Sequence, residues 1–256
     1  MRRVVTGVAA LAALVAGCGS DDEEQAGEGE SEPRLVVSAA SSMTEALTAC
    51  AENYPDAELK LQFAGSDELA AQIRQGVKPD VFAAANTRLP EELNREGLLS
   101  KPVVFATNEF VLAVPEDSAI AGMKDLTAED VKIVIGSDSV PIGEYTRESL
   151  ARLPAAQEKG ILANVRSNEP DVKGIVGKLT QGAADAGFVY VTDVNATGGA
   201  LEAIELPPEL EPEATYGAGV VEGAREPEEA QAFVDGLADG PCADALREAG
   251  FGPPPE

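Results

Sequence analysis

Serine residues stand at two places where a strand ends and a helix is expected to begin. A short apolar strand at 35–37 is followed by Ser42, and Glu45 completes the Ser-x-x-Glu spacing of a capping box, which predicts Ser42 at the helix N-cap. Ser66 follows an alternating strand at 59–63 and is a second cap candidate. Free N–H groups and the positive end of the dipole make a helix N-terminus attractive to an anion. These serines indicate either anion binding or ordinary helix capping.

The second half of the chain offers three more hydrogen-bond donors. The triplet Val140-Pro141-Ile142 reads as a turn that enters a helix. Pro170 suits the first helical position, which leaves the amide of Val172 in the first turn without an intrahelical partner. Tyr190 ends an apolar strand with a phenol, although a tyrosine there also suits the core or its rim. Ligands of open α/β sheets bind outside the carboxyl ends of the strands, so these donors are candidates for one site.

An enzyme that uses acidic residues for catalysis is the alternative to an anion-binding protein. The chain has no histidine, which excludes Ser-His-Asp and Cys-His catalysis and His-ligated zinc. A carboxylate-based extracellular hydrolase would draw on Asp67, Glu144, Asp171 and Asp193. Such enzymes favour large grooves lined by aromatic residues, whereas aromatic residues make up 4% of this chain and tryptophan is absent. This composition counts against such a hydrolase, and we expect no catalytic residues, no protein-ligated metal and no cofactor. A structural surface protein is a third possibility.

The N-terminus has the features of a bacterial lipoprotein signal. A basic start is followed by an apolar run at 4–16 that is too short to span a bilayer, and small residues precede Cys18. We expect a signal peptide at 1–17, cleavage before Cys18 and a lipid on its sulfur. The acidic segment 18–33 is expected to be a flexible stalk. The protein would then be extracytoplasmic and lipid-anchored to the outer face of the cytoplasmic membrane, at the cell surface or in the periplasm.

Charge and cysteine content limit the partners and the compartment. The net charge of −26 argues against binding to nucleic acid and to anionic lipid surfaces. With Cys18 assigned to the lipid, Cys50 and Cys242 remain. An even pair in an oxidising compartment suggests a disulfide, and two separate buried thiols are the alternative.

Strands and helices alternate through the body of the chain. This pattern predicts a mainly parallel sheet with helices on both faces. The expected strands are at 35–37, 59–63, 81–83, 110–114, 131–135, 186–190 and 217–221, and the expected helices at 42–52, 66–75, 90–96, 143–153, 170–180, 227–237 and 242–249. The long apolar strand at 110–114 is a candidate crossover between two lobes.

Several short motifs, taken in order, resemble the periplasmic molybdate-binding proteins of ABC transporters, which are type II solute receptors. The resemblance covers nearly all of 34–252. It rests on Ala-Ala-Ser-Ser-Met-Thr-Glu-Ala-Leu at 39–47, Phe-Ala-Gly-Ser at 63–66 with Leu-Ala-Ala-Gln-Ile at 69–73, Pro-Asp-Val-Phe at 79–82, Ala-Thr-Asn at 106–108, Val-Pro-Ile-Gly-Glu-Tyr at 140–145, Asp-Val at 171–172 and Gly-Phe-Val-Tyr at 187–190.

The resemblance implies an α/β fold of two lobes, each with a doubly wound, mainly parallel sheet, joined by two crossover segments. The first lobe would comprise 34–112 and 217–256, and the second 113–216. It also implies that a tetrahedral oxyanion, molybdate and also tungstate, binds between the lobes of a monomeric receptor, which delivers it to an ABC permease. The implied ligand contacts are the hydroxyls and amides of Ser42 and Ser66, the amides of Ile142 and Val172, and the hydroxyl of Tyr190.

Three residues depart from the family pattern. Ile142 stands where alanine is usual, which preserves an amide contact but makes the wall of the cleft bulkier. Asp67 and Glu144 lie next to the expected site, and either would repel an oxyanion if its side chain pointed inward. A receptor for another oxyanion, sulfate or phosphate, is therefore the alternative. A receptor for protonated phosphate would need an acceptor carboxylate, for which Asp67 is the candidate.

Overall fold

The structure, a computed structural model, describes residues 33–255. The signal peptide expected at 1–17, the lipid site at Cys18 and the stalk up to residue 32 lie outside this range. Within the described residues, no helix has both the length and the apolar character needed to cross a membrane.

The first sheet has the strand order β2-β1-β3-β10-β4. β1 (Arg34–Ala40) pairs in parallel with β2 (Glu58–Ala64) and β3 (Val81–Ala84). β10 (Ala214–Val220) is antiparallel to both β3 and β4 (Val103–Asn108). The carboxyl ends of β1, β2 and β3 therefore share one edge of the sheet, next to the helices that follow them.

The second sheet has the order β7-β6-β8-β5-β9. β6 (Ile133–Gly136) is parallel to β7 (Val165–Glu169) and β8 (Ala186–Tyr190). β5 (Phe110–Pro115) is antiparallel to β8 and to β9 (Leu201–Ile204). The expected α/β class is confirmed, and each sheet contains one strand that runs against the others. Sequence patterns missed β4, β7 and β9, because β7 is polar and half-exposed and β9 has four residues.

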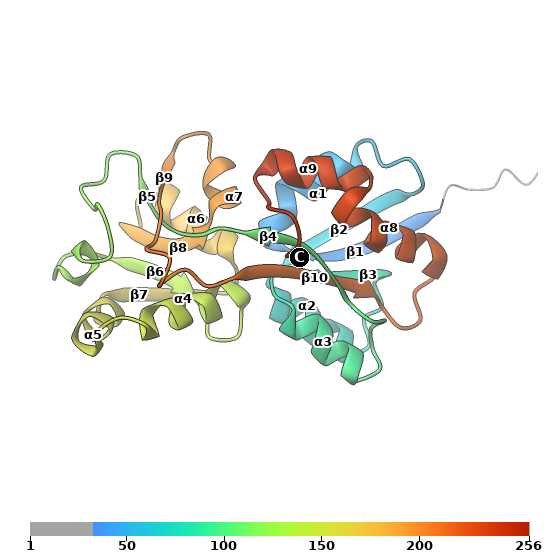
Figure 1. Ribbon diagram of the computed structural model, residues 1–256, viewed down its shortest axis with the longest axis horizontal. Coiled ribbons are helices and arrows are strands. Elements are labelled where there is room, and N and C mark those ends of the chain that lie inside the picture. The colour runs from blue at the N-terminus through green and yellow to red at the C-terminus, as the bar shows by residue number, and fades with distance from the viewer. Residues whose placement is uncertain (1–32, 256) are drawn as a thin grey trace, which may run out of the picture. The chain divides into compact units, whose positions relative to one another are not determined.

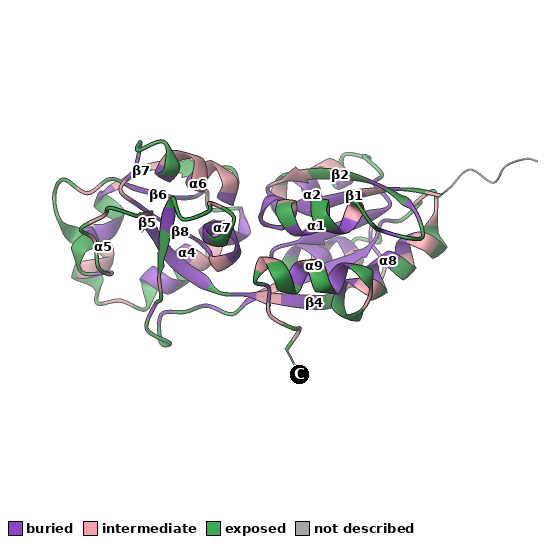
Figure 2. Cartoon of the chain, turned by 90° about the horizontal axis from the view of Figure 1, so that it is seen from above, coloured by how far each residue is buried: buried purple, intermediate pink, exposed green. Residues whose placement is uncertain are grey.

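Helices cover both faces of each sheet, as Figure 1 shows. In the first sheet α1 and α9 lie on one face and α2 and α3 on the other, and in the second sheet α6 and α7 lie opposite α4 and α5. The helices are α1 (Thr44–Ala51), α2 (Ser66–Arg74), α3 (Arg88–Arg95), α4 (Pro141–Ala151), α5 (Ala155–Ala163), α6 (Val172–Thr180), α7 (Val191–Asn195), α8 (Pro227–Asp239) and α9 (Pro241–Ala249). Two 3-10 turns, Ser41–Met43 and Asp125–Thr127, complete the elements. In Figure 2 the central strands β3, β5, β6 and β8 are buried and the outward helix faces are exposed.

The chain passes between the sheets twice, once between β4 and β5 and once between β9 and β10. We call 34–108 with 214–255 the first lobe and 110–204 the second lobe. The divisions expected at 112/113 and 216/217 fall inside β5 and β10, whereas each of these strands belongs to one sheet throughout.

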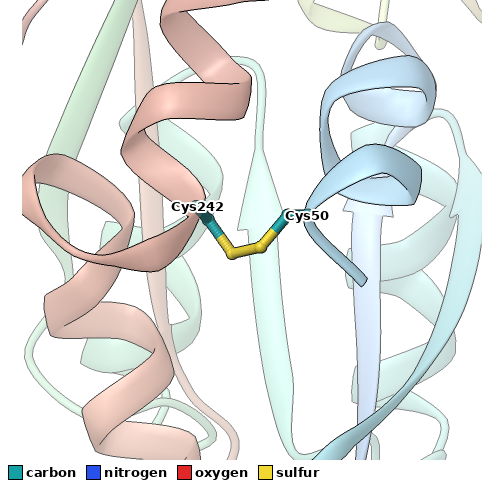
Figure 3. The surroundings of a disulfide bond; sticks show 2 residues. All are labelled: Cys50 and Cys242. Atoms are coloured by element: carbon teal, nitrogen blue, oxygen red, sulfur yellow. A yellow bond between two sulfur atoms is a disulfide. The ribbon is translucent and has the colours of Figure 1, made fainter. Parts of the chain in front are cut away.

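A disulfide joins Cys50 at the end of α1 to Cys242 at the start of α9, as Figure 3 shows. The two cysteines are 192 residues apart in sequence. Both are buried where α1 packs against α9. The bond therefore ties the C-terminal helices to the first helix of the same lobe.

Candidate functional site

A small cavity lies where helices of both lobes begin. Its volume is about 20 Å³, far below the roughly 300–1,000 Å³ of sites that hold drug-sized ligands. All five residues named from the resemblance line this cavity: Ser42, Ser66, Ile142, Val172 and Tyr190. Folding thus brings together residues that are up to 148 positions apart, because both sheets present strand ends and helix starts at the same point.

Ser42 reaches the cavity in a different way from the one expected. It lies inside the 3-10 turn that precedes α1, and no side chain caps either the turn or the helix, so the predicted capping box is wrong. The hydroxyl of Ser42 lies 2.9 Å from the hydroxyl of Tyr216. The turn continues the chain tightly from β1 and holds Ser42 buried at the wall of the cavity.

Ser66 is the first residue of α2, and Gly65 occupies the N-cap, so the prediction of Ser66 as a cap is also wrong. The Ser66 hydroxyl accepts a hydrogen bond of 3.1 Å from the amide of Ala85. A hydroxyl that accepts one bond still has its own hydrogen to donate. Ser66 therefore has both a hydroxyl hydrogen and a first-turn amide to offer an anion.

In the second lobe, α4 begins at Pro141, two residues before the expected start. Val140 occupies the N-cap, and the amide of Gly143 is bonded to the carbonyl of Val140 at 3.0 Å. Ile142 therefore lies in the first turn, where amides have no intrahelical partner. The expected amide donor is preserved despite the larger side chain.

Val172 is the first residue of α6, so its amide also lacks an intrahelical partner, as the sequence predicts. Pro170 does not start the helix, because Asp171 is the N-cap and its carboxylate accepts a bond of 2.9 Å from the amide of Gly174. Asp171 is the one carboxylate among the residues that line the cavity. Its bond to Gly174 directs one oxygen toward its own helix.

Tyr190 ends β8 with a hydroxyl that is buried and has no hydrogen-bond partner among the described residues. Burial raises the pKa of Tyr190 well above its ordinary value, so the phenol keeps its proton at neutral pH. An unsatisfied buried hydroxyl costs about 1–3 kcal/mol. A bound acceptor in the cavity would remove that cost.

The side chains of Asp67 and Glu144 make contacts outside the cavity. One oxygen of Asp67 accepts a bond of 2.5 Å from the hydroxyl of Ser139, and its other oxygen is buried without a hydrogen-bond partner among the described residues. Glu144 pairs with Arg88 and accepts a bond of 3.2 Å from the side-chain amide of Asn86. None of these five residues lines the cavity. Within the described part of the chain, no group of three or more acidic or cysteine residues is arranged to hold a metal ion.

Asp193 is buried behind Tyr190, beside Lys173 at 3.1 Å. Burial raises the pKa of Asp193 to about 6, against the lowering influence of the lysine. Asp193 does not line the cavity either. The four acids considered for a hydrolase therefore do not face one another across a substrate site.

Comparison with known proteins identifies the family. Over residues 35–252 the sequence matches the family described as bacterial extracellular solute-binding protein. The chain belongs to this family. The molybdate-binding protein ModA of Mycobacterium tuberculosis is 33% identical over 253 residues, which cover 95% of this chain and 94% of that protein. The putative ABC transporter substrate-binding lipoprotein YvgL of Bacillus subtilis is 30% identical, with 95% and 96% covered.

Solved structures share the fold of this solute-binding protein. The periplasmic molybdate-binding protein of Azotobacter vinelandii aligns with a TM-score of 0.77 at 18% identity, covering 86% of this chain and all of that one. The two-lobed periplasmic binding protein fold expected from the sequence is therefore confirmed.

Two residues that sequence reasoning missed support the site. Tyr216 is fully buried on β10, and its hydroxyl meets that of Ser42 and accepts a bond of 3.3 Å from the side-chain amide of Asn108. Asn108 also donates to the hydroxyl of Thr192 at 2.9 Å. The sequence signal that could have identified Tyr216 is its place directly before the buried strand expected at 217–221, because a buried phenol needs a polar partner.

The two lobes of this solute-binding protein contact each other around the cavity. The bonds between Ser139 and Asp67 and between Glu144 and Arg88 both cross from the second lobe to the first. The hydroxyl of Tyr145 also donates to the carbonyl of Ala85 at 3.2 Å. The structure therefore corresponds to a closed arrangement of the lobes.

Proposed function

We propose that this protein captures molybdate, and also tungstate, outside the cytoplasmic membrane and delivers it to an ABC importer. The observation that carries the proposal is the convergence of five neutral donors from both lobes on one small cavity. Family membership supports binding rather than catalysis. The names of the relatives support molybdate as the ligand.

The site chemistry suits a dehydrated dianion. No lysine or arginine lines the cavity. Positive potential comes instead from the N-termini of α2, α4 and α6, where first-turn amides and the helix dipoles face the same point. Each hydrogen bond to a charged acceptor contributes about 1.5–3 kcal/mol net, so several such bonds are enough for tight binding.

Selection among oxyanions would follow from protonation and size. A receptor for protonated phosphate needs an acceptor in its cavity, but Asp67 is bonded to Ser139 and lies outside the lining. Asp171 directs one oxygen to Gly174. Sulfate is smaller than molybdate, so it would leave some donors unpaired, and unpaired buried donors are costly.

We also propose that a lipid anchor holds the receptor near its ABC permease. Cleavage before Cys18 and a lipid on its sulfur would hold a monomeric receptor at the outer face of the cytoplasmic membrane, near its importer. The resemblance to YvgL, which is described as a lipoprotein, supports this arrangement.

Thermal unfolding of residues 34–256 with each of four oxyanions tests the function. A ligand that binds only the folded protein stabilises it by about 4 kcal/mol at 1,000-fold excess over Kd. We expect molybdate and tungstate to raise the Tm, and sulfate and phosphate to leave it unchanged. A rise with sulfate or phosphate instead would assign the receptor to that oxyanion, and no rise with any of the four would rule out the proposal.

Tyr190→Phe tests the site. The variant removes one donor to the ligand, so the Kd for molybdate should rise about 10-fold or more. The stability of the ligand-free protein should not fall, because the lost hydroxyl has no partner in the protein. Tyr54→Phe is the control, since Tyr54 packs against Phe233 away from the cavity. Unchanged calorimetric affinity of Tyr190→Phe would show that Tyr190 does not contact the ligand.

A further inference from the structure

Lys173 joins the two lobes beside the cavity. It is the second residue of α6 and directly follows Val172. Its ammonium group donates to both carboxylate oxygens of Glu45 in the first lobe, at 2.9 and 2.7 Å. The same group lies 3.1 Å from the carboxylate of Asp193 in the second lobe. One positive charge is thus shared between an acid of its own lobe and an acid of the opposite lobe.

The environment of Lys173 keeps it charged. Burial acts to lower the pKa of Lys173, but the attraction of Asp193 and Glu45 outweighs burial, and the net shift is upward. The side chain of Asp193 has no exposed surface, whereas those of Lys173 and Glu45 are 27% and 49% exposed. The link to Asp193 lies within the second lobe, so the link to Glu45 is the one that opening of the lobes would break.

The three charged residues adjoin three of the five proposed ligand donors. Glu45 lies in the first turn of α1, directly after the 3-10 turn that carries Ser42. Asp193 accepts a bond of 3.4 Å from the backbone amide of Tyr190. Lys173 is the neighbour of Val172. A shift of Lys173 would therefore be transmitted to donors on both sides of the cavity.

We propose that Lys173 is a positioning residue for oxyanion binding, whose bridge to Glu45 couples closure of the lobes to alignment of the Ser42, Val172 and Tyr190 donors. The proposal rests on the oxyanion-binding function. Lys173 does not line the cavity, so it acts through the residues that do. Its bridge to Glu45 should slow ligand release, because the lobes must separate before the ligand leaves.

Glu45→Gln separates this role from a simple effect of charge. Removing a carboxylate near the cleft favours a bound dianion by electrostatics alone, so a pure charge effect predicts tighter binding of molybdate. Loss of the bridge predicts the opposite, a molybdate dissociation rate that rises about 10-fold with little change in the association rate. Stopped-flow tyrosine fluorescence and calorimetry measure both quantities.

Lys173→Met should weaken binding at least as much as Glu45→Gln. Lys178→Met is the matched control, because Lys178 lies on the same helix and pairs with Glu169 at 3.0 Å inside the second lobe. Lys173→Met also leaves the buried Asp193 without its counter-charge, which destabilises the fold. The double variant Lys173→Met with Asp193→Asn removes that charge, so it should restore the Tm while molybdate release stays fast.

The outcomes distinguish the two proposals. Faster release from Glu45→Gln and from the double variant, with normal release from Lys178→Met, supports the role of Lys173. Molybdate binding by the parent chain together with equal or tighter binding by Glu45→Gln overturns that role alone. Failure of the parent chain to bind any of the four oxyanions overturns the function and, with it, the role of Lys173.

Discussion

At the scale of single residues, two of the three hydroxyls of the proposed site already have a hydrogen-bond partner within the protein. Ser66 accepts from Ala85, and Ser42 shares its hydroxyl with Tyr216. If these hydroxyls bind the ligand as proposed, the bonds orient them beforehand and so lower the entropy lost on binding. Burial raises the pKa of Tyr216 well above its ordinary value, so this supporting phenol also stays neutral.

The raised pKa of Asp193 predicts how the folding stability of the protein depends on pH. Its pKa rises from 3.8 in the unfolded chain to about 6 in the folded protein, mainly through burial. The folded state then binds the proton more tightly, so Asp193 favours folding below pH 4, and this contribution is lost as the pH rises to about 6. The loss amounts to about 3 kcal/mol.

Asp193→Asn should therefore gain stability relative to the parent chain between pH 4 and pH 7, by up to about 3 kcal/mol. The measurement is chemical denaturation of both proteins at a series of pH values. Because every other acid is common to the two chains, the difference isolates Asp193. A difference that does not vary with pH would contradict the raised pKa.

At the scale of elements, the site is a set of helix starts held by two sheets. The N-termini of α2, α4 and α6 meet at the cavity because each helix follows a strand end at the edge that faces the other lobe. In the first lobe, the disulfide between Cys50 and Cys242 holds α1, which follows the Ser42 turn, to the C-terminal helices.

Replacing both cysteines with alanine should destabilise the protein without changing its ligand. The bond closes a loop of 192 residues, for which chain entropy gives at most about 5 kcal/mol. Neither cysteine lines the cavity, so the Kd for molybdate should stay within about 2-fold of the parent value. Urea denaturation and calorimetry measure the two effects, and a variant as stable as the parent would contradict the structural role of the bond.

At the scale of the whole molecule, closure brings backbone atoms of the lobes very close together. A Cβ atom added to Gly65 would lie 2.5 Å from the carbonyl oxygen of Pro170 in the second lobe. Gly65 has φ −58°, which any residue adopts, so close approach explains the glycine here and backbone strain does not. A side chain at this position would hold the lobes apart.

Gly65→Ala should therefore bind molybdate at least 10-fold more weakly while its ligand-free stability stays near that of the parent chain. Small-angle scattering should show that molybdate compacts the parent chain more than the variant. Gly122→Ala is the control, because no atom lies within 4 Å of an added Cβ there and φ is not in the positive range. Full compaction of Gly65→Ala with molybdate would show that the lobes close in another way.

The sequence by itself determined the α/β class, the receptor family and five of the residues that line the cavity, because alternating strand and helix patterns and short motifs are local properties of the chain. Sequence patterns placed the start of α4 two residues late. They also predicted Ser42 and Ser66 as helix caps, whereas Ser42 lies in a 3-10 turn and Gly65 is the N-cap of α2. Helix ends are poorly determined by local pattern, since tertiary contacts choose among nearly equal starts.

Only the tertiary structure decided which way Asp67 and Glu144 point. It also decided that Tyr216 meets Ser42 and Asn108, and that Lys173 bridges Glu45 and Asp193. These orientations depend on partners in the other lobe or in distant strands, such as Ser139 for Asp67 and Arg88 for Glu144. No local pattern encodes a partner that is 72 positions away along the chain. Sequence motifs identify the residues of the proposed site, and packing between the lobes brings these residues together around one cavity.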